Sequence, residues 1–175
     1  TAKEHVGNVS GTRGKEVYLM NVGIFGLFIL AYYNLIGASF NSVTFGIIFC
    51  MLCTANSGSH PGNVWPIMLG YVVGSFGFSF LSGLAGGTYA MTINAQAIAI
   101  GLCFANGLSP ITSKYGWFWG MVSAVMHFLL VTSVPNMHGG FCLYNGGFTA
   151  AVICVLLVPV LEKCVKTRAE KAATK

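Results

Sequence analysis

The chain has 175 residues, of which 55% are hydrophobic and only 7% are charged, whereas an ordinary soluble domain carries about 25% charged residues. From Val17 to Leu161 the only Lys, Arg, Asp or Glu is Lys114. A soluble protein of this size needs a charged outer surface, so the composition excludes a soluble globular domain and indicates an all-α polytopic integral membrane protein in a lipid bilayer.

The other charges lie in two polar ends. Residues 1–16 are expected to be a polar lead-in between helices of a longer chain, because Thr1 is not an initiator methionine and these residues contain no apolar signal-peptide core. Residues 162–175 form a basic tail, which predicts a cytoplasmic location. Nucleic-acid binding is not expected, because no aromatic residues accompany the basic ones.

Between these ends, residues 17–161 are predicted to form the membrane domain. A bilayer is spanned by roughly 20 apolar residues. The candidate segments are 17–37, 40–55, 64–83, 89–106, 115–134 and 141–161. Six crossings put both termini and the loop at Lys114 on one side, so both termini are expected to be cytoplasmic. Alternatively, segment 40–55 or the stretch after it re-enters without crossing, which would reverse the orientation of every later segment.

A polar stretch without carboxylate, Lys or Arg comes after the second segment: Leu52-Cys-Thr-Ala-Asn-Ser-Gly-Ser-His-Pro-Gly-Asn63. The run Leu102-Cys-Phe-Ala-Asn-Gly-Leu-Ser-Pro110 repeats it, since residues 52–80 align without gaps on 102–130. A looser third copy, Cys142-Leu-Tyr-Asn-Gly146, keeps the Cys-x-x-Asn-Gly pattern. These copies predict broken or re-entrant helices and an internal repeat, which is parallel if both intervening segments cross and inverted if one does not.

The repeated breaks indicate a path through the membrane. Non-helical backbone survives in a bilayer only where protein or water satisfies it, and broken helices of transporters place free backbone groups at the substrate site. The candidate lining residues are Asn56, Ser57, Gly58, Ser59, His60, Asn106, Gly107, Ser109, His127, His138, Asn145 and Gly146. The alternative is that the breaks are ordinary interfacial turns, which use the same residue types.

His127 is an ionisable group inside an apolar segment, and such a group is a functional hypothesis by default. It would act as a proton relay or solute gate, or else lie neutral and hydrogen-bonded between helices. His60 and His138 lie in breaks, where they would line a vestibule or the membrane interface.

Metal binding and enzyme chemistry are both disfavoured. The chain has no second Cys-x-x-Cys pair and no His-x-x-x-His motif, so no metal or cofactor is predicted. No carboxylate lies in the membrane region, so general acid–base catalysis would fall to histidine alone. The same absence argues against a cation path built on acidic rings. A neutral polar solute, or an ion held by backbone carbonyls and helix dipoles, fits better; an anion at a helix N-terminus is a further possibility.

Three stretches resemble a known family: His60-Pro-Gly-Asn-Val-Trp-Pro-Ile-Met-Leu-Gly70, Ile93-Asn-Ala-Gln-Ala97 with Gly107-Leu-Ser-Pro110, and Val134-Pro-Asn-Met-His-Gly-Gly-Phe-Cys-Leu-Tyr-Asn-Gly-Gly-Phe148. They are similar to the C-terminal half of an uncharacterised family of bacterial polytopic membrane proteins, a domain of unknown function. The resemblance covers most of the chain. It implies a longer parent protein and a bacterial inner membrane, and it assigns no activity and no site residue.

These observations predict a membrane channel or secondary transporter, or part of one, for a small uncharged or weakly charged solute. Six segments could surround a pore only with partners, so a homo-oligomer or the missing N-terminal half is expected. Two other function classes remain open. One is a non-transporting scaffold or assembly subunit, in which the breaks are turns. The other is a membrane enzyme that uses His60, His127 or His138.

Overall fold

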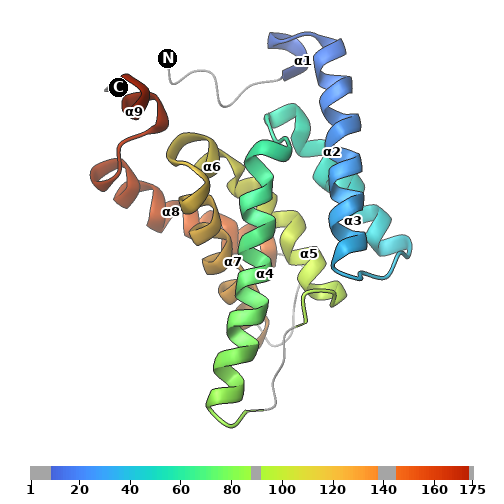
Figure 1. Cartoon of the computed structure of the whole chain (residues 1–175), viewed down its shortest axis with the longest axis vertical. Helices are drawn as coiled ribbons and strands as arrows, with labels where there is room; N and C mark the ends of the chain where they lie inside the picture. Colours follow the sequence, from blue (N-terminus) through green and yellow to red (C-terminus); the bar gives the residue numbers. More distant parts are fainter. Residues whose placement is uncertain (1–8, 88–91, 138–144, 174–175) are drawn as a thin grey trace.

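In the computed structural model the chain is a bundle of helices (Figure 1), and the structure describes residues 9–87, 92–137 and 145–173. These residues contain no strand, which confirms the all-helical prediction. The elements are α1 Val9–Thr12, α2 Lys15–Leu35, α3 Ser42–Cys53, η2 Thr54–Ser57, α4 Pro61–Leu84, α5 Gln96–Ala105, η3 Asn106–Leu108, α6 Ser109–Tyr115, α7 Trp117–Met137, α8 Asn145–Cys164 and α9 Arg168–Ala173.

Among the described residues, four helices are long and apolar enough to cross a membrane: α2, α4, α7 and α8. The second and fourth predicted segments are shorter. α3 has 12 residues and α5 has 10, which at 1.5 Å per residue gives about 18 Å and about 15 Å. Neither length reaches across a hydrocarbon core of about 30 Å, so the prediction of six full-length segments is replaced by four long helices and two short ones that end in 3₁₀ turns.

The late start of α5 has a local cause. Its predicted segment begins at residue 89, but Ala95 N–H bonds Thr92 O at 2.9 Å in a turn, and the helix starts only at Gln96. Gln96 Nε2 then donates to Asn41 Oδ1 at 3.0 Å. Asn41 is also the N-cap of α3, accepting from Val43 N–H at 3.0 Å, so the two short helices begin side by side.

α7 runs further than predicted. The break expected at Pro135 lies inside the helix, which continues to Met137. Pro135 removes one backbone hydrogen-bond donor close to the end of the helix, where the loss of a single bond is tolerated. The predicted break at residues 138–140 lies outside the described residues.

The charged residues of the described chain gather at one end of the bundle. α2, α4 and α7 run away from the end at which α1 and α9 lie, and α3, α5 and α8 run back toward it (Figure 1). The charges belong to the turn between α1 and α2, to the start of α2, to α6, and to the end of α8, the loop after it and α9. Lys114 Nζ lies 3.0 Å from Glu162 Oε1 and joins α6 to α8. Residues 35–41, 84–87 and 92–96, at the opposite end, carry no charge.

The central contact is between α4 and α7. A Cβ atom on Gly70 would lie 2.6 Å from Ala124 Cβ, and one on Gly74 would lie 2.9 Å from the Phe128 ring. The missing side chains therefore let the two helices approach closely, as small residues do in lipid, where packing rather than hydrophobic burial holds helices together. α4 follows the first break and α7 comes after the second, so this contact sets where the two breaks lie relative to each other.

Candidate functional site

The first break is a closed turn between α3 and α4. After η2, Gly58 takes a left-handed conformation with φ 99°, which glycine adopts without steric cost. His60 then caps α4, because its Nδ1 accepts from Gly62 N–H at 3.1 Å, and Pro61 occupies the first helical position. Asn63 completes the cap by accepting from His60 N–H at 2.9 Å. The Asn-Ser-Gly-Ser-His sequence thus ends one helix and starts the next.

The second break is built differently. η3 leads directly into the short helix α6, and the chain reaches its left-handed residue only at Gly116, with φ 107°. A Cβ on Gly120 would meet the Thr112 side chain, so α6 packs against the first turn of α7. The gap-free repeat therefore describes the breaks but not the helices after them, because residues 61–84 form one helix whereas Gly116 separates α6 from α7.

The two breaks meet in a polar contact that we call the seam, formed by Thr54, Ser59, Asn63, Asn106, Ser109 and Ser113. Ser59 Oγ lies 3.1 Å from Ser109 Oγ, and Asn63 Nδ2 donates to Ser113 Oγ at 3.1 Å. In each pair the two positions are 50 residues apart, the offset of the repeat. Ser59, Asn63, Asn106 and Ser109 are buried. Most of the seam is thus an uncharged, buried hydrogen-bond network.

Asn56 and Asn106 occupy equivalent positions but have different surroundings. Asn106 is 0% exposed, and its Nδ2 donates to Thr54 Oγ1 and, at 3.5 Å, to Met51 O. Asn56 is half-buried, and its Oδ1 accepts from Ser10 N–H at 3.3 Å. The repeat places Phe104 opposite Thr54, and a phenyl ring cannot accept a hydrogen bond. Asn56 therefore has no hydroxyl partner to match the one that holds Asn106.

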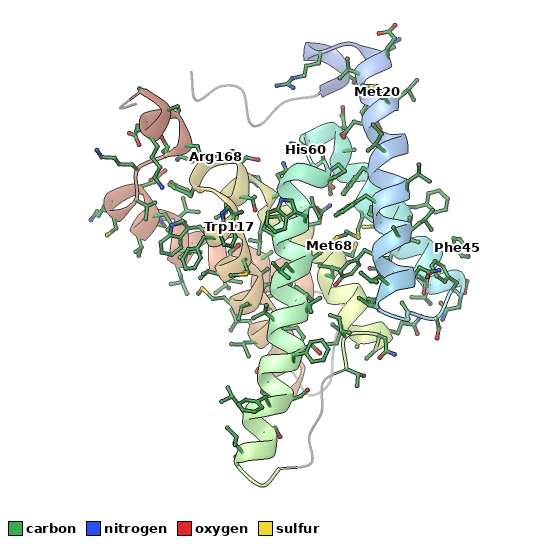
Figure 2. The ribbon with its side chains drawn as sticks, viewed as in Figure 1. Met20, Phe45, His60, Met68, Trp117 and Arg168 are labelled. Atoms are coloured by element: carbon green, nitrogen blue, oxygen red, sulfur yellow. The ribbon has the colours of Figure 1, made fainter. Side chains whose placement is uncertain are left out.

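The seam lies toward the charged end of the bundle. Asn21 Nδ2 donates to Ser59 O at 2.9 Å, and Asn21 is six residues beyond Lys15, or about 9 Å along α2. Figure 2 shows His60 at the start of α4, in the same half of the molecule as Arg168. The breaks are therefore close to the polar end and not halfway across the bundle.

A second buried cluster, the histidine cluster, consists of Tyr71, His127, Gly146 and Thr149. His127 is 0% exposed. Its Nδ1 lies 2.6 Å from the Tyr71 hydroxyl, and its Nε2 lies 2.9 Å from Gly146 O and 3.0 Å from Thr149 Oγ1. The cluster ties α4 and α7 to the first turn of α8, so α8 starts beside the middle of α7.

The partners assign the tautomer of His127. A backbone carbonyl can only accept, so Nε2 carries the proton that bonds Gly146 O. Nδ1 is then an acceptor, and the Tyr71 hydroxyl donates to it. Thr149 donates its own proton to Gly146 O at 2.9 Å. Ser123, which lies one turn before His127, instead donates to Gly120 O at 2.8 Å. The neutral imidazole is fully hydrogen-bonded between helices.

The predicted site residues therefore divide into groups. The structure brings Ser59, Asn106 and Ser109 together in the seam, and His127 and Gly146 together in the histidine cluster. Ser57, His60 and Gly107 are exposed, and Gly58 shapes the first turn. Asn145 is the first residue of α8, and His138 lies outside the described residues. One contact joins the two clusters, because Gly146 lies against the ring of Phe104, two residues before Asn106.

The sequence patterns did not single out Thr54, Asn63, Ser113, Tyr71 and Thr149. The repeat carried a signal for two of these, since its gap-free alignment places Asn63 opposite Ser113 and both are polar in an apolar chain. Tyr71 and Thr149 had none, because a single tyrosine or threonine in an apolar helix is common and its hydrogen-bond partner depends on how the helices pack.

The electrostatics of the first break favour neutral ligands. The N-terminus of α4 is closed by the His60 cap, so its N–H groups are not free to bind an anion. Desolvation of the His60 ring, followed by the positive charge of Arg13, lowers the pKa of the imidazole and keeps it neutral and able to cap. Within the described ranges, no group of three His, Cys, Asp or Glu side chains is placed to hold a metal ion.

A family model described as "Protein of unknown function (DUF1576)" matches residues 9–163. The matched region includes every element from α1 to α7 and nearly all of α8. No curated protein and no solved structure matches the chain.

Proposed function

The chain belongs to the family described as proteins of unknown function, DUF1576, and from the geometry of its two breaks we propose that it is a membrane channel or secondary transporter, or part of one, for a small uncharged or weakly charged solute. The observation that carries the proposal is the seam. Two helix breaks, far apart in sequence, meet in a buried network of hydroxyl and amide groups that contains no charge.

Three physical points support a path at this place. Breaks in apolar helices are expected where polar groups face a cavity or a solute. The equivalent positions of the two copies contact each other, as substrate-site residues do where two repeats meet. The charge nearest to the second break in sequence, Lys114, is paired with Glu162 across α6 and α8, which leaves the seam itself neutral.

The proposal requires partners. α3 and α5 are too short to line a path along its whole length, so a homo-oligomer or the N-terminal half of a longer parent chain would complete it. We further propose a bacterial inner membrane with both termini in the cytoplasm. The location of every described charge at one end of the bundle supports this orientation under the positive-inside rule.

A second candidate is a non-transporting scaffold or assembly subunit. It is favoured by internal hydrogen bonds that pair Ser59 with Ser109, Asn63 with Ser113, and both nitrogens of the His127 ring with neighbouring helices. The burial of His127 speaks against an enzyme that uses this histidine, since its imidazole has no free nitrogen to offer a substrate.

Cysteine accessibility separates the two candidates. On a background without native cysteines, Ser59→Cys and Ser109→Cys are treated in membranes with a small, uncharged, water-soluble thiol reagent. A path predicts that both react, although their side chains are buried within the protein. Inert cysteines at both positions in folded protein would support the scaffold and contradict the path.

Two control positions make the result interpretable. Leu27→Cys lies on an apolar surface of α2, 69% exposed, and faces lipid, so it is expected to stay inert. Gly107→Cys is exposed beside the seam and is expected to react under either candidate. If the cysteine at position 107 reacts and those at 59 and 109 do not, the thiol reagent reaches the surface beside the seam, and the seam itself is closed to it.

A further inference from the structure

The second break contains a buried acceptor with no partner. Asn106 Oδ1 is among three buried side-chain polar atoms, with Thr112 Oγ1 and Tyr115 Oη, that have no hydrogen-bond partner in the part of the chain that the structure describes. Buried polar atoms are almost always paired, so an exception at a candidate site indicates a missing ligand or water.

Rotating the amide does not remove this exception. The Nδ2 group faces Met51 O, which can only accept, and Thr54 Oγ1. The Thr54 hydroxyl already gives its proton to Met51 O at 2.6 Å, so it can only accept from Asn106. Exchanging the amide nitrogen and oxygen would place a third acceptor against these two, and the oxygen must therefore face away from α3.

The repeat gives an internal comparison for this position. The equivalent oxygen, Asn56 Oδ1, is half-buried and accepts from Ser10 N–H at 3.3 Å. Of the two, the Asn106 oxygen alone is both fully buried and unpaired. The donor to the Asn56 oxygen comes from α1, which lies outside the repeated stretches, so the two asparagines are expected to differ in function.

The chemistry around Asn106 limits what could bind. The free atom is an oxygen that accepts, so the ligand must donate an O–H or N–H. An anion has nothing to offer it, and the closed α4 N-terminus offers no N–H to an anion. A cation would leave its charge uncompensated in this buried site, because Glu162, the carboxylate that reaches α6, already pairs with Lys114 at the polar end.

We propose that Asn106 Oδ1 is the hydrogen-bond acceptor that binds an uncharged, donor-bearing solute, such as a small polyol or amide, at the second break. The first break, with Asn56, is not a binding site. This inference rests on the proposed transport function and identifies Asn106 Oδ1 as the atom that selects the solute.

The test is solute flux into membrane vesicles from cells that express the full parent protein, followed by light scattering with glycerol, urea and potassium formate as probes. Wild-type protein is expected to carry glycerol or urea and not formate. Asn106→Leu removes the acceptor at similar volume and should lower the protein-dependent flux roughly tenfold, the effect of one lost hydrogen bond at a buried site. Asn56→Leu, the matched control in the other copy, should change it less than about twofold.

A second measurement covers the case in which Asn106→Leu does not fold. In the wild-type background, with Gly107→Cys as the single cysteine, glycerol or urea bound at Asn106 should slow the thiol reaction in a saturable way. If neither glycerol nor urea shows protein-dependent flux, the proposed function itself is contradicted. Flux that is unchanged in Asn106→Leu, that favours formate, or that leaves Cys labelling at 107 unaffected overturns this inference alone.

Discussion

Gly70 shows how one missing side chain sets the distance between α4 and α7. A Cβ atom there would lie 2.6 Å from Ala124 Cβ and 2.7 Å from Met121 O. Gly70→Ala is expected to destabilise the protein by about 1–3 kcal/mol, because backbone on α7 would have to move. The thermal midpoint in detergent measures this.

Gly77 in the same helix is the matched control. A Cβ at this position would meet nothing within 4 Å, and alanine is the better helix former by about 0.8–1.0 kcal/mol. Gly77→Ala should therefore leave the thermal midpoint unchanged or raise it. Equal losses for the two variants would show that α4 and α7 do not approach each other at Gly70.

The buried ring of His127 depends on Tyr71 more than on Thr149. Tyr71→Phe removes the hydroxyl that donates to Nδ1 at 2.6 Å and leaves a buried acceptor unpaired, at a cost of about 1–3 kcal/mol. Thr149→Val removes a weaker, shared contact, since Gly146 O still accepts from Nε2, and should cost less. Differential thermal unfolding checks the order. If His127 were a proton relay, Tyr71→Phe would instead change the pH dependence of flux while stability stayed the same.

At the scale of the element, α4 depends on a cap that titrates. His60 Nδ1 must be unprotonated to accept from Gly62 N–H, and the pKa of His60 is lowered below 6.5 by desolvation and then by Arg13. The folded state therefore favours the neutral ring. The stabilisation is present above the unfolded pKa of about 6.5 and is lost as pH falls through the lower folded pKa.

The thermal midpoint is accordingly expected to fall between about pH 7.5 and about pH 5. His60→Asn keeps an N-cap residue without a titrating group, so its midpoint should lose the part of the pH dependence that His60 causes. An unchanged pH profile in His60→Asn would show that the cap contributes nothing to this dependence.

The elements also show what could be predicted from the sequence. The four long helices could be located, because a run of about 20 apolar residues has few alternatives in a bilayer. The short α5 could not, because Thr92 to Asn94 are no more polar than residues inside neighbouring helices, and the start of the helix is held by the contact of Gln96 with Asn41. The repeated residues fall at η2 and η3, where α-helix gives way to 3₁₀ turns, but the repeat could not rank Asn106 above Asn56. That difference depends on Thr54 facing Asn106 across the bundle, which no spacing in one sequence reveals.

For the whole molecule, the distribution of charge predicts the orientation. Seven Lys and Arg and three Glu lie in the described residues, all toward the end at which α1 and α9 lie, whereas residues 35–41, 84–87 and 92–96 carry none. The positive end is expected to stay in the cytoplasm because basic loops resist translocation. Single cysteines at three positions test this on a background without native cysteines: Ser39→Cys, Ala85→Cys and Lys166→Cys.

In intact cells, a membrane-impermeant maleimide should label the cysteines at positions 39 and 85, and the one at position 166 only after the membrane is permeabilised. The reason is that α3 and η2 return the chain to the charged end before α4 leaves it, so residues 39 and 85 share the opposite side (Figure 1). Labelling at 39 but not at 85 would mean that α3 enters and leaves from the same side. In that case the seam and Lys166, which lie at the same end of the bundle, would both face the outside, and the charge argument for a cytoplasmic seam would fail.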